Sequence, residues 1–340
     1  DVDDGNVVYT ILTAAATSSD GNYDTKDAAD VSVTNVDNDT AGITVSVISG
    51  DTTEAGAGTA TFTVVLDTEP TSDVTIDLTS SDTGEGTVGV SSVVFTAVTW
   101  STSQTVTVTG VDDWLDDGDI VYTIQTAAAT SVDLVYAGED AADVQVTNVD
   151  DDTAGIAVSA ISGDTTEDLG TAQFTVVLET KPTSDVTIGI SSSNTGEGTV
   201  STGSLTFTSG DWDTARTVTV TGVNDDIDDG DVVYTIITAA AVSVDGNYDT
   251  MNASDVPVRN VDNDTAGITV SVISGDTTEG LGEATFTVVL ETEPTSDVVI
   301  GLTSSAPDEG TVGAASVTFT PVNWSVLQTV TVTGVNDFVI

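Results

Sequence analysis

Hydrophobic and polar residues alternate along most of this 340-residue chain. In one run Phe62, Val64 and Leu66 fall on one face of an extended backbone, and threonines fall on the other. A period of two with β-branched and aromatic residues is typical of half-buried β-strands. Further apolar runs of this kind occupy residues 43–48, 74–78, 94–95, 106–108, 120–124 and 144–146.

Short turn sequences rich in Pro, Gly, Ser and Asp separate these runs, at residues 69–73, 82–86 and 100–103. About seven strands in about 112 residues predict an all-β fold, an antiparallel immunoglobulin-like sandwich with one polar face per sheet. A short helical turn could form only in the alanine run at residues 127–129, and no sustained helix is expected.

The whole pattern repeats about every 112 residues. The sequence Asp-Thr-Ala-Gly-Ile begins at Asp39, Asp152 and Asp264, and tryptophans recur at positions 100, 212 and 324. We therefore expect two complete repeats, residues 40–152 and 153–264. Residues 1–39 are expected to be the C-terminal part of another repeat, and residues 265–340 the N-terminal part of a further one.

The chain stops at about the phase of the repeat at which it begins. The simplest interpretation is a segment of a longer tandem array, with sandwiches following one another in a rod. The alternative is that the first strands of one chain complete the last repeat of another, which would give a filament.

Composition restricts the function. Four Lys and Arg face 56 Asp and Glu, a formal charge of -52, which excludes nucleic acid and argues against anionic membranes as partners. With 39% hydrophobic residues, the chain can still build a core. It has no His and no Cys, so disulfides, thiolate chemistry and the usual general base are absent. No run is long enough to insert into a membrane.

The acids gather at four places in each complete repeat. In the first they are Glu54 after the first strand, Glu85 in a Gly-Glu-Gly turn, the run 112–119, and the triplet 150–152. Such runs repel themselves unless a cation neutralises them. Calcium takes six to eight oxygen ligands, from carboxylates and carbonyls. The alternative is that each acid caps a turn or keeps an edge strand soluble.

Each repeat also carries a few aromatic residues outside the strands. Trp100, Trp212 and Trp324 lie in a turn, where a packed corner is favoured over a sugar-stacking role. Tyr23, Tyr136 and Tyr248 are expected to anchor a long loop. Trp114 is the one candidate for a ligand contact that differs between repeats, since Asp226 and Phe338 take its place.

Several segments, taken in order, resemble the Calx-β domain. They are Thr53-Glu54, residues 59–66, Gly86-Thr87-Val88, residues 93–96, residues 104–108, Asp112-Asp113 with Asp117 four later, and Val149-Asp150-Asp151-Asp152. That family includes cytoplasmic calcium sensors of sodium–calcium exchangers and tandem modules of large bacterial surface proteins. The resemblance implies a seven-stranded sandwich with calcium at one end, near the joint to the next module.

The resemblance also implies a set of calcium ligands. In the first complete repeat these are Glu54, Asp112, Asp113, Asp117, Asp150, Asp151 and Asp152, with Glu85 standing in for a ligand of the family's longer middle loop. In the other copies they are Glu167, Glu197, Asp225, Asp229, Asp262, Asp264, Glu279, Glu309, Asp37 and Asp39. Asparagine replaces aspartate at positions 38, 224, 263 and 336. The lower ligand charge predicts the weak affinity of extracellular modules, roughly 10⁻⁴–10⁻³ M.

The favoured function is a calcium-rigidified extender in a secreted bacterial surface protein, such as an adhesin stalk, a fibre or a sheath. Its partners would be the neighbouring repeats of the same chain, and identical chains if a fibre forms. The alternatives are a filament subunit completed by strand exchange and a carbohydrate- or protein-binding module. An enzyme is not expected, because carboxylates without His, Cys or nearby bases could act only as a glycosidase pair.

Overall fold

In the computed structural model, residues 1–336 are described, and every regular element among them is a β-strand. The all-β fold class predicted from the sequence is therefore confirmed. The chain divides into two compact units, Asp1–Thr153 and Ala154–Ile340. The described residues include no helix with the length and hydropathy of a membrane span.

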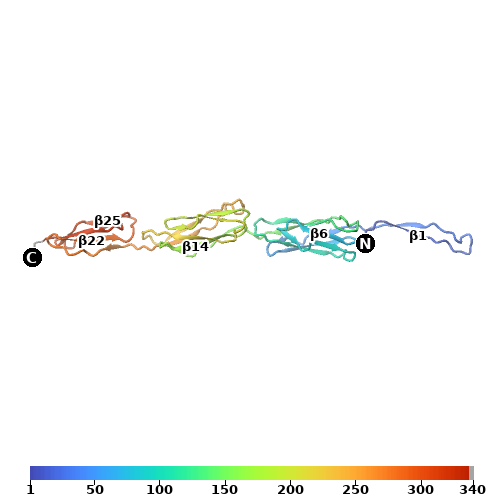
Figure 1. Ribbon diagram of the computed structural model, residues 1–340, viewed down its shortest axis with the longest axis horizontal. Coiled ribbons are helices and arrows are strands. Elements are labelled where there is room, and N and C mark those ends of the chain that lie inside the picture. The colour runs from blue at the N-terminus through green and yellow to red at the C-terminus, as the bar shows by residue number, and fades with distance from the viewer. Residues whose placement is uncertain (337–340) are drawn as a thin grey trace. The chain divides into compact units, whose positions relative to one another are not determined.

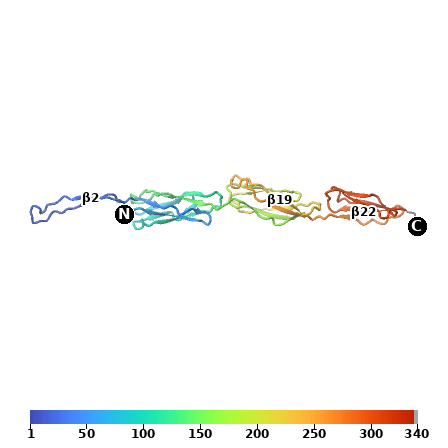
Figure 2. The same cartoon turned by 180° about the vertical axis from the view of Figure 1, so that it is seen from behind.

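The first unit holds a hairpin and one sandwich, which we call the first sandwich. In the hairpin, β1 (Val7–Ile11) pairs only with β2 (Val31–Asn35), and it is drawn in blue in Figures 1 and 2. One sheet of the sandwich has the order β3-β5-β9-β7 and the other the order β4-β11-β10-β6-β8. The strands are β3 (Ile43–Val45), β4 (Thr52–Thr53), β5 (Thr59–Leu66), β6 (Val74–Ser80), β7 (Gly86–Val88), β8 (Ser92–Phe95), β9 (Gln104–Gly110), β10 (Ile120–Thr126) and β11 (Val144–Val149).

The second unit holds a second sandwich with the same strand orders, β12-β14-β18-β16 and β13-β20-β19-β15-β17. Its strands are β12 (Ile156–Val158), β13 (Thr165–Thr166), β14 (Thr171–Leu178), β15 (Val186–Ser192), β16 (Gly198–Val200), β17 (Ser204–Phe207), β18 (Arg216–Gly222), β19 (Val232–Thr238) and β20 (Val256–Val261).

A third sandwich follows in the second unit. It has a sheet of order β21-β22-β26-β24, and opposite it only the pair β23-β25. Its strands are β21 (Ile268–Val270), β22 (Glu283–Leu290), β23 (Val298–Gly301), β24 (Gly310–Val312), β25 (Ser316–Phe319) and β26 (Gln328–Gly334). Within the described residues, no strand takes the positions that β10 and β11 hold in the first sandwich. Thr278, the counterpart of Thr53 in β4, belongs to no strand but still lies against the end of β26 at Gly334.

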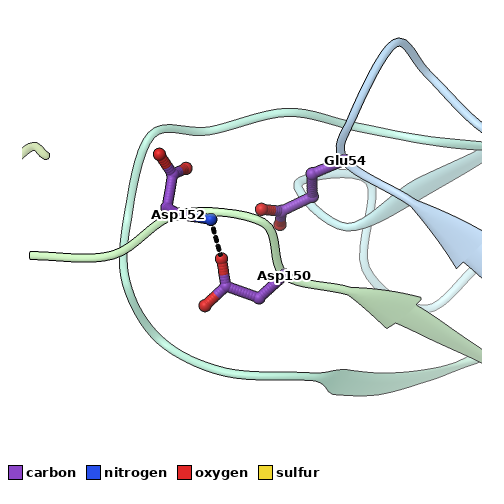
Figure 3. Close-up of side chains that lie close together, drawn as sticks. All are labelled: Glu54, Asp150 and Asp152. Carbon is purple, nitrogen blue, oxygen red and sulfur yellow. Dashed lines mark hydrogen bonds between the residues drawn. The ribbon is translucent and has the colours of Figure 1, made fainter.

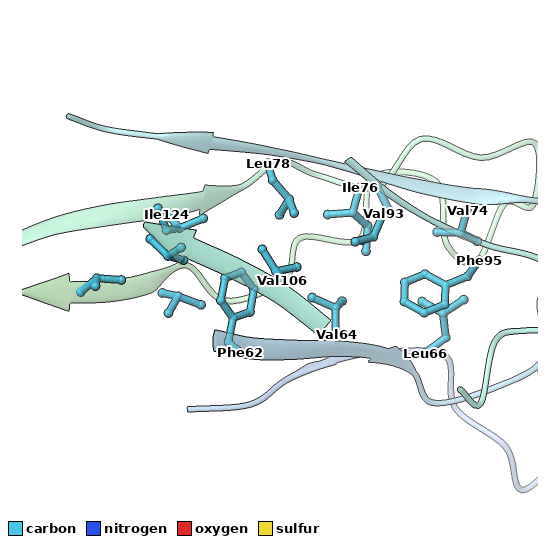
Figure 4. Close-up of a cluster of buried hydrophobic side chains, with 14 of the residues drawn as sticks. Phe62, Val64, Leu66, Val74, Ile76, Leu78, Val93, Phe95, Val106 and Ile124 are labelled. Carbon is cyan, nitrogen blue, oxygen red and sulfur yellow. The ribbon is translucent and has the colours of Figure 1, made fainter. Parts of the chain in front are cut away.

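The two sheets of the first sandwich enclose one apolar core, shown in Figure 4. Every second residue of β5 from Ala60 to Leu66 is buried, as the period of two predicts. Phe62 from one sheet and Ile76 and Phe95 from the other are each at most 1% exposed. Burying apolar surface of this kind drives folding, at about 25 cal/mol per Å².

The strand pattern differs from the prediction in detail. The first sandwich has nine strands where about seven were expected, because the short β4 and β7 are too brief to show a period. The strand expected over residues 43–48 ends at Val45, as β3. After it, the hydroxyl of Ser46 accepts the Thr63 N–H at 2.9 Å, which interrupts the backbone pairing with β5. No helical turn forms in the alanine run at 127–129, and Thr130 after it makes a bridge to Thr75 of β6 instead.

Candidate metal centre

Two groups of acids lie at one end of the first sandwich. In the first group, Glu54, Asp150 and Asp152 each place a carboxylate oxygen within 4.8 Å of the others (Figure 3). Strand pairing explains why they meet. β4 and β11 are parallel neighbours, with Val149 opposite Thr53, so the residues that follow both strands leave the same edge of the sheet.

Glu54 is the buried member of this first group, with 2% of its surface exposed. Its Oε1 accepts a hydrogen bond from Asn148 Nδ2 at 3.3 Å, while its Oε2 is buried without a hydrogen-bond partner. Asp152 Oδ2 is likewise buried and unpartnered, and the Asp152 N–H donates to Asp150 Oδ1 at 2.7 Å. A buried carboxylate oxygen without a donor or a cation is costly, so these atoms point to a missing positive partner.

The second group consists of Glu85, Asp113 and Asp117, again with oxygens within 4.8 Å of one another. Glu85 precedes β7 and Asp113 follows β9, and these strands are antiparallel with Gly86 opposite Gly110. The loop is also tied by the Val111 N–H, which donates to Glu85 O at 3.0 Å.

Asn148 connects the two groups. Its Nδ2 lies 3.3 Å from Glu54 Oε1, 3.4 Å from Glu85 Oε2 and 3.0 Å from Val111 O. The sequence analysis missed this residue, although Asn precedes the acidic triplet by two positions in every copy, at 35, 148 and 260. That recurrence within otherwise threonine- and valine-rich strands is the signal that could have found it.

The second sandwich repeats both groups, as Glu167 with Asp262 and Asp264, and as Glu197 with Asp225 and Asp229. Asn260 Nδ2 donates to Glu197 Oε2 at 3.3 Å, as its counterpart does in the first sandwich. The contacts of the buried glutamate of the first group differ: the Asn263 N–H donates to Glu167 Oε2 at 3.1 Å, whereas Glu54 Oε2 has no such donor and Glu54 Oε1 accepts from Asn148 Nδ2.

Burial and mutual repulsion change the acidity of these groups. Burial, with the negative charges of Asp113 and Asp150 added, raises the pKa of Glu54 from 4.5 to about 7. Burial also raises the pKa of Glu167 to about 7. The pKa values of Asp117 and Asp152 are raised for the same two reasons. At neutral pH a proton and a cation therefore compete for these carboxylates.

The donor chemistry of both groups fits a hard cation. All ligand atoms are oxygens, and the chain has no His or Cys with which to favour a softer transition metal. The two groups of acids, linked by Asn148, supply several carboxylate oxygens from four separate segments of the chain. A calcium ion needs several oxygen ligands of this kind.

The structure brings together twelve of the eighteen predicted ligands. Among the described residues the other six belong to neither kind of group, and they are Asp37, Asp39, Asp112, Asp151, Glu279 and Glu309. Asp112 still lies near enough for its charge to raise the pKa of Asp152. The Asp39 N–H donates to Asp37 Oδ1 at 2.9 Å, as the Asp152 N–H does to Asp150 Oδ1. Glu279 lacks such partners because the third sandwich has no strand in the place of β11, whose end carries Asp150 and Asp152 in the first sandwich. For Glu309, the counterpart of Asp113 is Asp337, which lies outside the described residues.

The aromatic residues divide into anchors and exposed side chains. Trp100, Trp212 and Trp324 pack against the three cores, in agreement with the packed-corner interpretation. Tyr136 and Tyr248 are buried loop anchors, at 0% and 1% exposed. Tyr23 in the hairpin differs, with 65% exposed. Trp114 is 55% exposed, and its counterpart Phe338 lies outside the described residues.

No protein-family model matches the chain, and no curated protein sequence matches it. The solved structures that match include calcium-binding domain CBD12 of CALX1.1, at 16% identity and a TM-score of 0.28, covering 56% of this chain and 77% of that one. Domains 4–9 of surface layer protein SbsC match at 15% identity and a TM-score of 0.25, covering 88% of this chain and 43% of that one. At these values the chain is assigned to no family.

Proposed function

We propose that the chain is a calcium-stabilised structural extender, part of a secreted bacterial surface protein. The observation that carries this proposal is the buried, unpartnered Oε2 of Glu54, set among acids whose counterparts recur around Glu167. A divalent cation bound there would offset the repulsion and hold the end of β4, the loop after β9 and the end of β11 to one another. A folded, acidic, repeated sandwich with such an ion at its end suits a role in spacing rather than catalysis.

The proposal includes a location outside the cell and no enzymatic activity. Weak calcium sites are filled only where calcium is abundant, as it is outside cells. Both complete sandwiches carry the same acidic groups in the same places, and neither departs from the pattern to form a distinct active site.

Thermal unfolding of the full chain tests the proposal. At a calcium concentration of about 100 times Kd, a folded-state ligand adds about 2.7 kcal/mol, which raises the Tm of a domain of about 100 residues by about 10 °C or more. The double variant Glu54→Gln, Glu167→Gln should lose most of this increase. The control Glu139→Gln changes an exposed acid outside both groups and should keep it.

Magnesium at equal concentration should have a much smaller effect, because it loses its water shell reluctantly and demands a stricter geometry. Equal melting temperatures in calcium and in chelator would overturn the proposal and leave the acids as solvated turn residues.

A further inference from the structure

Arg259 of the second sandwich binds two aspartates near the candidate metal centre. Its Nη2 and Nε both donate to Asp164 Oδ2, at 2.6 and 3.2 Å, and its Nη1 donates to Asp231 Oδ2 at 3.0 Å. The three side chains are between 39% and 48% exposed, and a single ion pair at such a surface stabilises a fold little. One guanidinium shared by two carboxylates forms a small network, which contributes more than an isolated pair.

This arginine connects the same parts of the sandwich as the proposed cation. Asp164 directly precedes β13, and Glu167 directly follows it. Asp231 ends the acidic loop after β18, and Arg259 lies on β20, one residue before Asn260. A single positive side chain therefore joins β13, the loop after β18 and β20 without a metal ion.

The positive charge of Arg259 also lies close to the acids of the metal centre. While Asp231 Oδ2 accepts from Arg259, its Oδ1 accepts the Asp262 N–H at 3.3 Å. The Asp262 carboxylate in turn accepts the N–H groups of Gly230 and Asp264, both at 2.7 Å. One carboxylate thus separates the guanidinium from Asp262, a member of the group around the buried glutamate.

The first sandwich has the same two aspartates and no arginine. The counterparts of Asp164, Asp231 and Arg259 are, in that order, Asp51, Asp119 and Thr147. Asp119 Oδ1 still accepts the Asp150 N–H, at 3.2 Å, so this link forms without an arginine beside it. No Lys, Arg or His occurs between residues 40 and 152. What Arg259 adds to the second sandwich is therefore positive charge, and not the placement of the acid.

The position of Arg259 faces away from the core in both sandwiches. Arg259 lies opposite Val233 on the neighbouring strand, and Thr147 lies opposite Val121. Side chains of directly opposite residues share one face of a sheet, and these two valines are 68% and 63% exposed. The two sandwiches therefore differ here in surface charge while their packing is the same.

We propose that Arg259 is an internal counter-charge that replaces part of the bound cation, and that it makes the second sandwich less dependent on calcium. Without metal, the arginine reduces the repulsion among the acids and connects the elements that carry them. When calcium enters, the same charge opposes it. Both effects decrease the stability that calcium adds. The effect without metal stands by itself, whereas the effect on calcium binding rests on the proposed function.

Two reciprocal substitutions test this in the full chain. Arg259→Thr gives the second sandwich the residue of the first, and Thr147→Arg does the reverse. Hydrogen exchange measured by mass spectrometry reports on each sandwich separately, through peptides that cover β5 and β14. Two quantities are compared, the protection from exchange in chelator and the calcium midpoint, which is the concentration that gives half of the added protection.

Arg259→Thr should lower the protection of the second sandwich in chelator and lower its calcium midpoint by about threefold. A change of this order is expected for one unit charge that acts on a divalent ion through water and salt. Thr147→Arg should change both quantities of the first sandwich in the opposite direction. Arg259→Lys keeps the charge and should keep most of both effects. In each variant the unchanged sandwich should behave as in the wild type.

Two substitutions at the other end of the sandwiches are matched controls. Arg216→Gln removes a positive charge from the second sandwich at a position where the first has Gln104, and Gln104→Arg adds one to the first. Position 216 begins β18, and the acidic loop follows the end of this seven-residue strand, about 20 Å away. The Debye length is about 8 Å at physiological salt, so both controls should leave the calcium midpoints unchanged.

Three results would overturn the inference. They are calcium midpoints that do not respond to the reciprocal substitutions, midpoints that respond equally to the controls, and protection in chelator that Arg259→Thr does not lower. Failure of the proposed function has a different signature, since calcium would then add no protection to either sandwich in any variant. In that case the measurements in chelator would still decide whether Arg259 offsets the repulsion among the acids.

Discussion

At the scale of single residues, the most informative side chain is Glu54. It is 2% exposed and is surrounded by Asp113, Asp150 and Glu85, whose charges add to the effect of burial on its pKa. A carboxyl placed in this way is stable either when protonated or when a cation replaces the proton. The residue therefore couples the stability of its sandwich to pH and, under the proposed function, to calcium.

The pH dependence of the metal-free chain follows from this residue and Glu167. Their pKa is raised in the folded state, so between about pH 4.5 and 7 the folded chain binds more protons than the unfolded chain. The free energy of unfolding should therefore decrease as the pH rises through this window. We expect the Tm of calcium-depleted protein to be higher near pH 5 than near pH 7.5.

Glu54→Gln with Glu167→Gln should flatten this pH dependence. Carboxyls with lowered pKa, such as Asp133, act in the opposite sense only below their ordinary value of 3.8, outside the window. A Tm that rises between pH 5 and 7.5 in metal-free protein would contradict the assignment. In the presence of calcium, the decrease in Tm between pH 5 and 7.5 should be smaller, because protons and the cation compete for the same oxygens.

At the scale of elements, the candidate site depends on the closeness of β4, β9 and β11. A Cβ on Gly110, the last residue of β9, would lie 2.5 Å from both Thr53 O and Asn148 Oδ1. The backbone of β9 thus touches the end of β4 and the asparagine that links the two acidic groups. Gly222 meets the equivalent atoms in the second sandwich.

Replacing Gly110 with alanine should separate these elements. The new methyl group would meet a backbone carbonyl that cannot rotate away, and overpacking of this kind costs about 1–3 kcal/mol. We expect a lower Tm in chelator, and a smaller increase on adding calcium because the two acidic groups move apart. Gly203→Ala, where nothing lies within 4 Å of the added atom, should leave both quantities unchanged.

The long elements could be predicted from the sequence, and the short ones could not. The period of two in β5 identifies its buried face from Ala60 to Leu66. The two-residue β4 shows no period, and it is held by pairing with β11, such as the bond from Thr52 Oγ1 to Asn148 Oδ1 across 96 residues. The acids could be proposed from their recurrence, but their division into two groups depends on that pairing and on Asn148.

At the scale of the whole molecule, the charge of -52 is distributed over a chain with only four Lys and Arg. Ion pairs cannot balance it, and the described residues contain few, such as Arg259 with Asp164 and Asp231. Self-repulsion therefore opposes the folded state throughout the chain, beyond the two acidic groups in each complete sandwich.

Salt should reduce this general repulsion without replacing the specific cation. We expect the Tm in chelator to rise between about 0.01 and 1 M NaCl, as the Debye length decreases from about 30 to 3 Å. Calcium at matched ionic strength should raise it further. Glu54→Gln with Glu167→Gln should keep the increase with NaCl and lose the additional increase with calcium. If NaCl alone reproduced the whole calcium effect, screening would explain the stability and no specific site would be needed.

The N–H of Asn263 gives Glu167 Oε2 a hydrogen bond that Glu54 Oε2 lacks, and Asp151 stands where the second sandwich has Asn263. The first sandwich thus offers calcium more negative charge and a more poorly satisfied oxygen. If calcium binds as proposed, we expect the two repeats to load at different calcium concentrations, the first sandwich before the second. A chain with such unequal sites would gain stability over a broad range of calcium concentrations and not at a single threshold.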